Sequence, residues 1–367
     1  MDDNIYIMWL TLIDGLGIKK QHQLLESFGD AKKIFNTSRQ ILRTISFLNE
    51  KIVNNIIKSQ DTGLIKKYIS QLEESDTKFM SIRDKEYPSM LKEISNPPVG
   101  IYLKGCLPDN SLPKVSIIGA RRSSEYGLNV SYKLSKDLAK RGIVIVSGLA
   151  SGIDSMSHKG ALDANGYTIA VLGFGTSECY PVENKNLMQK ISRNGCLISE
   201  YPPYTKALPA YFPARNRIIS GLSSATIVVE ASEKSGTLIT VNEALAEGRT
   251  VMAVPGNITS KLSAGTNELI RDGAAPVSSY KDVLYELGID NSNINLLKHK
   301  DTAENISKTF SKEEQLIYDY LSFEPITVDQ LILETKSTIQ TLNYLLTMLE
   351  LKGHIQKLPG QRYIRAL

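Results

Sequence analysis

Cysteine is scarce in this sequence, and long apolar runs are missing. The three cysteines, Cys106, Cys179 and Cys196, form no C-x-x-C pair, which argues against a disulfide framework and a thiolate zinc site and favours packed thiols. No stretch reaches the eighteen or so apolar residues that a membrane span needs. The N-terminus opens with acids where a signal peptide carries a basic region. We therefore expect a cytoplasmic protein with no membrane span.

Motifs for catalysis and cofactor binding are also missing. The sequence holds no complete Walker A pattern, no H-E-x-x-H and no convincing nucleophile triad. The stretch "VLGFGTSECYP" offers G-x-G but places Glu178 where the dinucleotide fingerprint needs a third glycine. We therefore expect a protein that uses no cofactor and is not an enzyme.

One enzymatic alternative stays open, because a Rossmann architecture hosts many functions. Phosphoribohydrolases cleave nucleotides on a similar architecture and carry a P-G-G-x-G-T-x-x-E run. This chain has "SGTLITVNEAL" in its place, so Glu243 falls at a different phase of the helix and the catalytic pair is not reproduced. Release of free base from nucleoside monophosphates would support this alternative.

Positive charge is concentrated in the middle of the chain. The net charge is only +4, but residues 114–280 hold 18 Lys and Arg against 13 Asp and Glu. An uneven basic excess of this kind hints at a partner that carries phosphate.

The 367 residues divide into several segments by pattern. Residues 1–75 have helical periodicity, with a short Gly-Leu-Gly turn in a helical hairpin. Residues 76–113 are rich in proline and form a connecting segment in which "IYLKG" is the one strand-like stretch. Residues 114–290 form an α/β core, residues 291–307 a linker, and residues 308–367 a small C-terminal domain.

The core alternates short β-branched runs with helical stretches. Near-continuous apolar runs that end in Gly or an acid are typical of parallel strands buried on both faces. The pattern predicts a Rossmann-like doubly wound, mostly parallel sheet with helices on both sides. Six such runs occur: "KVSIIG", "IVIVSG", "TIAVLG", "CLISE", "ATIVVE" and "TVMAVPG".

The C-terminal domain reads as a winged helix. Three helical stretches each open with a Ser or Thr three residues before Glu or Gln, the pattern of a capping box. Two strands around Pro359-Gly360 follow them. The third helix, residues 337–352, has a single Lys and lacks a basic face for reading a duplex, so a protein-interaction or weak DNA-binding role is at least as plausible. The three predicted capping pairs are Ser311 with Glu314, Thr327 with Gln330, and Ser337 with Gln340.

Candidate binding residues follow the first strand of the core. Ligands of an open parallel sheet bind beyond the carboxyl ends of its strands. There, Gly119 allows a sharp turn, Arg121 and Arg122 supply guanidinium groups, and Ser123 or Ser124 can cap the next helix. The free amides of that helix start would face an anion, so we expect a phosphate site.

The later strand ends carry further candidates. Gly148 and Gly152 allow close approach of the backbone, whereas Asp154 has a structural role and His158 is a packed or surface histidine. A second helix start with the geometry of an anion site comprises Ser235, Gly236 and Thr237.

The stretch "FPARNRIISGLSS" raises a different question. Between Glu200 and Glu230 the chain has no carboxylate to pair with Arg215 and Arg217. A partner must therefore be distant in sequence or come from outside the protein. Alternation along a helix start points the two guanidinium groups in different directions, so one can bind DNA while the other braces the loop. We predict both as DNA-binding residues.

These motifs, in this order and spacing, closely resemble the DNA-processing protein A (DprA/Smf) family. The resemblance covers residues 80–285 and rests on "SIIGARRSSEYG", "IVSGLASGIDSMSHKGAL", "LISEYPP", "FPARNRIISGLS", "SGTLIT" and "GTNELIRDGA". It implies a sterile-alpha-motif-like helical domain before the core and a winged helix after it. It also implies binding and protection of single-stranded DNA in natural transformation, loading of the RecA recombinase, and a homodimer through the Rossmann core.

The resemblance also places the DNA. Family members hold the strand in a basic pocket at the carboxyl edge of the sheet, to which the arginine after the first strand contributes, here Arg121. By strand order, Phe212 and Asn216 of the "FPARNR" block fall near this edge, and Lys185 is a further candidate for a phosphate contact. Cations that follow the phosphates and aromatic rings that stack on bases suit sequence-independent binding of a single strand.

Overall fold

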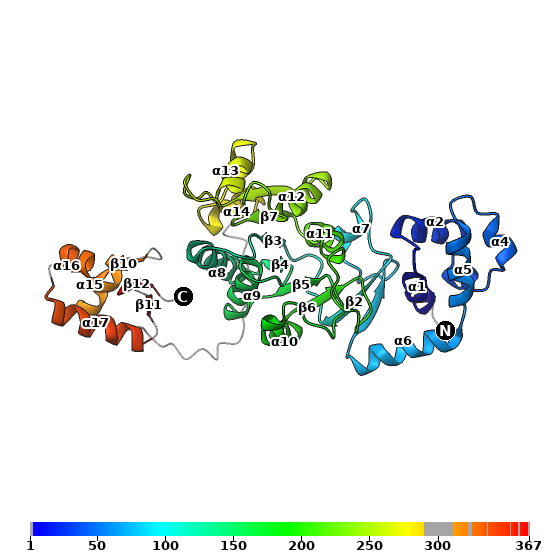
Figure 1. The fold of residues 1–367 in the computed structure, drawn as a ribbon, viewed down its shortest axis with the longest axis horizontal. Helices are drawn as coiled ribbons and strands as arrows, with labels where there is room; N and C mark the ends of the chain where they lie inside the picture. Colours follow the sequence, from blue (N-terminus) through cyan, green and yellow to red (C-terminus); the bar gives the residue numbers. More distant parts are fainter. Residues whose placement is uncertain are drawn as a thin grey trace.

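The computed structural model describes residues 3–289, 311–321, 325–335, 337–352, 354–358 and 360–365. The expected linker and Pro359 lie outside these ranges. Figure 1 shows a group of N-terminal helices beside one edge of a large mixed sheet, and a separate small C-terminal domain. In the part of the chain that is described, we find no helix that is both long and apolar enough to cross a membrane.

The N-terminal segment is helical, as predicted. Gly15 has a φ of 75° and lies in the turn between the first two helices, while Gly29, with a φ of 71°, ends the second. Trp9 is fully buried, and its ring packs edge-on against Phe35 at a centroid distance of 5.0 Å. The helices are α1 Asp3–Thr11, α2 Ile18–Phe28, α3 Ala31–Phe35, α4 Arg39–Arg43, α5 Glu50–Ser59 and α6 Thr62–Glu74.

A nine-stranded sheet forms the core, in the order β1-β2-β6-β5-β4-β3-β7-β8-β9. The six predicted runs form β3 to β8, and all of these strands pair in parallel, which confirms the doubly wound prediction. The strands are β1 Lys78–Ser81, β2 Gly100–Gly105, β3 Lys114–Ile118, β4 Val144–Ser147, β5 Thr168–Leu172, β6 Cys196–Ser199, β7 Ala225–Val228, β8 Thr250–Ala253 and β9 Ala275–Pro276.

The segment between residues 76 and 113 contributes more to the sheet than we expected. "IYLKG" is β2, but β1 is a second strand, and together they extend the sheet by antiparallel pairing of β1 with β2 and of β2 with β6. The proline-rich composition of the segment concealed this edge, because the prolines lie in the loops around the two strands. The connecting segment is therefore an integral edge of the sheet.

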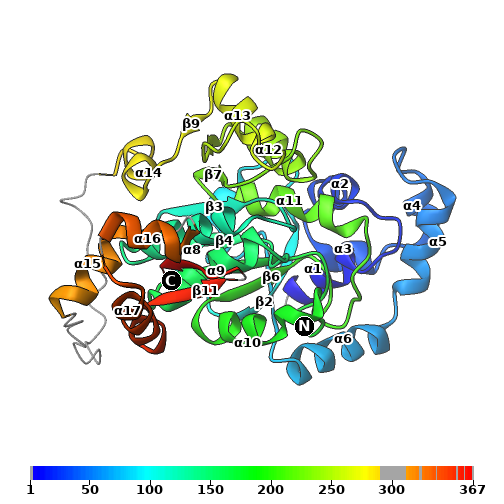
Figure 2. The same cartoon turned by 60° about the vertical axis from the view of Figure 1, so that its left-hand side comes forward.

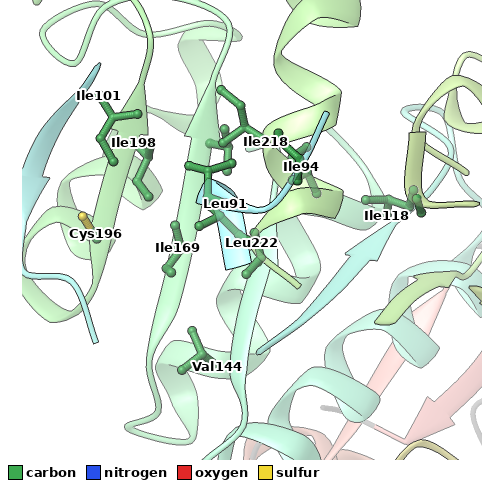
Figure 3. Close-up of a cluster of buried hydrophobic side chains, with 14 of the residues drawn as sticks. Leu91, Ile94, Ile101, Ile118, Val144, Ile169, Cys196, Ile198, Ile218 and Leu222 are labelled. Atoms are coloured by element: carbon green, nitrogen blue, oxygen red, sulfur yellow. The ribbon is translucent and has the colours of Figure 1, made fainter. Parts of the chain in front are cut away.

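Helices cover both faces of the sheet. Alternate residues of one strand point to opposite layers, so Val144 and Val146 of β4 pack in one cluster while Ile143 and Ile145 pack in the other. Figure 3 shows Leu91, Ile94, Ile218 and Leu222 grouped together in the first of these clusters, with Leu91 and Leu222 close to Ile169 of β5. The helices are α7 Ser89–Lys92, α8 Glu125–Ala139, α9 Ile153–Asp163, α10 Lys185–Asn194, α11 Tyr211–Gly221, α12 Thr237–Ala246, α13 Ala264–Arg271 and α14 Tyr280–Glu286, with a short 3-10 turn η1 Val182–Asn184.

The N-terminal helices are fastened to the antiparallel edge of the sheet. Asp3 at the start of α1 pairs with Arg83 at 2.7 Å, and the Asn4 side-chain amide donates to Asp84 at 2.8 Å. Phe79 of β1 packs with the helical core and lies edge-on to Tyr102 of β2. Figure 2 shows α1 beside β2 from a second direction.

The C-terminal domain is a winged helix, as predicted. The capping boxes at Ser311 and Thr327 form as expected, with reciprocal backbone-to-side-chain hydrogen bonds. The third prediction, at Ser337, is wrong: Thr338 is the N-cap and accepts a hydrogen bond from the Thr341 amide. The elements are α15 Lys312–Tyr320, β10 Ile326–Thr327, α16 Val328–Thr335, α17 Ile339–Leu351, β11 Ile355–Leu358 and β12 Arg362–Arg365.

Candidate functional site

A pocket of about 560 Å³ opens at the carboxyl edge of the sheet. Its walls come from the loops after β3 and β4 and from the first turns of α11 and α12, because the carboxyl ends of parallel strands meet at one edge. Eight of the predicted site residues line it, namely Gly119, Arg121, Phe212, Arg215, Asn216, Ser235, Gly236 and Thr237.

Arg121, which is exposed, and Phe212, which is half-buried, lie next to each other in the pocket. The Arg121 guanidinium lies 5.4 Å from the centroid of the Phe212 ring, a cation–π arrangement. The ring of Tyr180, which is 49% exposed, lies 5.5 Å from Phe212. Arg122 is exposed on the same loop as Arg121 but does not line the pocket. The site thus combines a solvent-accessible cation with aromatic rings.

Ser124 is engaged inside the protein. It caps α8, because its hydroxyl accepts from the Gly127 amide at 3.1 Å. Glu230, at the end of β7, is buried and accepts hydrogen bonds from both the amide and the hydroxyl of Ser124. The predicted anion geometry is therefore present, but the anion at this helix start is the protein's own carboxylate.

Three predicted glycines give the backbone close approach. A Cβ at Gly119 would lie 2.7 Å from a side-chain carbon of Ile153, and one at Gly152, whose φ is 79°, would lie 2.4 Å from the Ala120 carbonyl oxygen. A Cβ at Gly148 would lie 2.5 Å from the guanidinium of Arg215. These glycines shape the loops that carry the site.

Arg215 forms part of the pocket floor and is only 4% exposed. Its Nη1 donates to the Gly148 carbonyl at 2.7 Å and to the Val171 carbonyl, so it joins α11 to the ends of β4 and β5. Burial lowers the pKa of Arg215 to about 10, and the nearby carboxylate of Asp154 opposes this shift. The guanidinium therefore remains charged at neutral pH beneath the pocket.

Arg217 points elsewhere and has a partner inside the protein. Its Nη2 lies 2.5 Å from Oε1 of Glu200, and its Nη1 donates to the Asn96 carbonyl at 2.6 Å. The carboxylate thus comes from just after β6, at the limit of the acid-free stretch. Both arginines thus brace α11 against the sheet, and the prediction that both bind DNA stays a prediction.

The remaining candidates lie at helix starts. Ser235 accepts from the Thr237 amide at 3.2 Å at the start of α12, which faces the pocket. Lys185 is exposed at the start of α10 and does not line the pocket. Asp154 lines the pocket and accepts from the Gly148 amide at 3.1 Å, in keeping with the predicted structural role, whereas Glu243 does not line it.

His158 is a packed histidine, as expected. It is fully buried, and its Nδ1 lies 2.7 Å from the hydroxyl of Thr168. That hydroxyl donates to the Ile145 carbonyl, so Nδ1 carries the proton. Burial, together with the charge of Arg215, lowers the pKa of His158 to about 3.

Sequence reasoning missed three residues that shape the site. Tyr180 lies in the loop after β5, whereas Glu200 and Glu230 each follow a strand that ends at the pocket edge. In the sequence, the two carboxylates mark the boundaries of a stretch without acids. The signal that could have found them is their place directly after a buried strand, the same place that identified Arg121. No group of three His, Cys, Asp or Glu side chains within the described ranges is arranged to hold a metal ion.

The fold and the site define a Rossmann-like protein with a cationic and aromatic pocket at the carboxyl edge of its sheet. Residues 78–288 match the family model for DNA recombination-mediator protein A, and residues 301–361 match the DprA winged helix domain. The chain belongs to the DNA recombination-mediator protein A family. The first match begins at β1, which agrees with an antiparallel edge that is integral to the sheet.

Relatives support this assignment over the whole chain. Protein Smf of Synechocystis is 30% identical and is aligned over 98% of both chains. DNA processing protein DprA of Bacillus subtilis is 45% identical over 56% of this chain and 70% of its own length. The crystal structure of the Streptococcus pneumoniae protein matches with a TM-score of 0.66 and 35% identity, over 78% of this chain and 98% of that one.

A second similar structure is that of a protein that binds single-stranded DNA. DNA processing protein A from Helicobacter pylori, which is described as having a unique single-stranded DNA binding mode, matches with a TM-score of 0.52 and 30% identity. The match covers 58% of this chain and 97% of that one.

Proposed function

We propose that this protein binds single-stranded DNA in the pocket at the carboxyl edge of its sheet. The observation that carries the proposal is the exposed Arg121 above Phe212, at the mouth of a pocket about 560 Å³ in volume. A phosphate would pair with the guanidinium, while a base stacks on the rings of Phe212 and Tyr180. Recognition by phosphate and by ring faces tolerates any base sequence.

Charge at the base of the pocket supports the same proposal. Arg215 is held beneath the pocket, exposed Arg122 lies on the loop after β3, and exposed Lys185 begins α10. The pocket lining holds Arg121 and Arg215 against one carboxylate, Asp154, and a cationic excess in a concave surface attracts a polyanion. In this proposal Arg215 acts through the field and through loop geometry, and Arg121 makes the direct contact.

The finer role is also a proposal, and it rests on the family. We infer that the protein works in the cytoplasm as a binder without catalytic activity, protects incoming strands in natural transformation, and loads the RecA recombinase onto them. We further propose a homodimer through the Rossmann core. Sedimentation with and without oligo-dT would test the dimer, and a strand-exchange assay with RecA would test loading.

The binding proposal is tested by Arg121→Ala. We expect the affinity for oligo-dT to fall about tenfold, in line with the energy of a phosphate contact and a base platform. The slope of log affinity against log salt should also fall by about 0.7, since one fewer counterion is released from a single strand. Fluorescence anisotropy over a salt series measures both quantities.

Arg193→Ala is the matched control for Arg121→Ala. Arg193 is exposed in the last turn of α10, at the end of the helix that lies away from the pocket. Its loss changes the net charge by the same amount. Equal losses of affinity in the two variants would show that the overall charge of the protein, and not the pocket, attracts DNA.

A further inference from the structure

A second cavity, of about 660 Å³, lies between α8 and the segment that leads from β9 into α14. Its lining residues on α8 run from Tyr126 to Asp137, which corresponds to roughly 16 Å of helix at 1.5 Å per residue. The opposite wall is formed by Val277, Ser278, Ser279 and Tyr280. None of the residues predicted to bind DNA lines this cavity.

The cavity is lined by aromatic and aliphatic side chains, by the charged Lys133 and Asp137, and by one unsatisfied amide. Asn129 is 5% exposed, and its Nδ2 has no hydrogen-bond partner among the described residues. An unpaired buried amide costs about 1–3 kcal/mol, so such a group calls for an explanation. The hydroxyls of Ser278 and Ser279, by contrast, both donate to Asp282. Asn129 is therefore a buried group from which a ligand would gain a hydrogen bond.

Tyr126 stands one helical turn before Asn129, on the same face of α8. Its ring is 41% exposed, and its hydroxyl donates to the Pro255 carbonyl at 2.9 Å, which fixes the ring in place. The cavity thus combines an anchored aromatic ring with an amide one turn deeper. The other ring, Tyr280, is held by Arg141, whose guanidinium lies 3.5 Å from the ring centroid.

The cavity and the pocket share one edge of the sheet. Tyr126 follows Arg121 and Arg122 by only a few residues, at the start of α8, and β9 runs parallel to β8, so that Val277 also lies beyond a carboxyl end. A strand whose phosphate lies at Arg121 would pass Arg122 on its way to Tyr126. One DNA strand could therefore occupy the pocket and the cavity together.

We infer that the cavity receives a nucleobase of the same DNA strand, stacked on Tyr126 and hydrogen-bonded to Asn129; this rests on the proposed function. An amide offers a donor and an acceptor side by side, as a base edge does. Tyrosine supplies a ring for stacking. The volume falls within the range of small-ligand sites and exceeds what a single base requires.

The test uses short oligo-dT strands that each lack one base, with the abasic position moved along the strand. For the unaltered protein we expect affinity to drop about tenfold when the missing base is the one in this cavity, the size of one stacked base. In Asn129→Leu, which replaces the amide with an apolar side chain of similar size and removes its hydrogen bond, that position should lose its sensitivity. Positions that depend on Phe212 should keep theirs.

Further variants make the result decisive. Tyr126→Leu, at a partly exposed position, tests the same contact if Asn129→Leu does not fold. Asn194→Leu, at an exposed asparagine at the end of α10, is the matched control and should leave the abasic profile unchanged. The inference is overturned if the folded Asn129 or Tyr126 variant has the abasic profile of the unaltered protein. If the unaltered protein does not bind oligo-dT at all, the proposed function itself fails.

Discussion

Arg215 and Arg217 lie two residues apart on α11 and are held by different acceptors. Arg215 donates to carbonyl oxygens at the ends of β4 and β5, whereas Arg217 pairs with Glu200 beyond β6. Arg217 and Glu200 meet because the chain that leaves β6 returns to the sheet as α11. Sequence distance alone therefore does not reveal the partner. Among the predicted cations, Arg121 has the exposure and the aromatic neighbour that a direct contact requires.

Gly148 is required by the side chain of Arg215. In Gly148→Ala the new Cβ would stand 2.5 Å from Nη1, so the guanidinium must move away from its carbonyl acceptors. We expect the free energy of unfolding to fall by about 1–3 kcal/mol, as for other overpacked sites. Urea unfolding followed by circular dichroism measures the change.

Gly236→Ala is the matched control for Gly148→Ala. Gly236 lines the pocket that Arg215 also lines, but a Cβ there meets nothing within 4 Å and its φ is −59°. Its stability should stay within about 0.5 kcal/mol of the unaltered protein. Equal losses in the two variants would refute the role that we assign to Gly148.

His158 makes stability depend on pH in one direction. Its pKa in the folded protein is about 3, because burial and the charge of Arg215 oppose protonation. Between pH 6.5 and about 3 only the unfolded chain takes up this proton, so stability falls as pH falls. In His158→Gln the decline with pH should be shallower, by up to about 1.4 kcal/mol per pH unit. Parallel pH profiles of the two proteins, from urea unfolding, would rule this out.

At the scale of elements, the hydrophobic pattern predicted the central strands better than it predicted the antiparallel edge of the sheet or the first residues of the helices. β3 to β8 are buried on both faces, and their near-continuous apolar runs stand out in the sequence. β1 is as long as β4 but has a mixed burial pattern, so its sequence carries little signal. The Glu230–Ser124 contact joins residues 106 apart in the chain, and only the pairing of β3 with β7 brings them together.

The start of α17 gives a test at the scale of one helix. Thr338→Ala removes the side chain that accepts from the Thr341 amide and should destabilise the winged helix by about 1 kcal/mol. Ser337→Ala, one residue earlier, should change stability by a few tenths at most. Amide hydrogen exchange at Thr341 reports the difference locally, and faster exchange in the Ser337 variant than in the Thr338 variant would contradict the assigned cap.

At the scale of the whole molecule, the proposed DNA contacts all belong to the sheet domain. Deleting residues 308–367 should therefore leave affinity for oligo-dT within about threefold of the full chain, since no residue of the pocket is removed. The same deletion should abolish any duplex binding that the winged helix supports. Anisotropy with single-stranded and duplex probes of equal length checks both, and a large loss for the single strand would place essential contacts in the winged helix.

The junction between the N-terminal helices and the sheet has a consequence for partners. Ser75 and Thr77, which join α6 to β1, are both 5% exposed, and Thr77 shares a hydrogen bond with Thr176 at 2.8 Å. The N-terminal helices and the sheet are thus joined by a packed junction and not by a flexible linker. A protein that binds α5 would therefore be held in a fixed orientation relative to the pocket. Fluorophores on α5 and α10 should show the same energy-transfer efficiency with and without DNA.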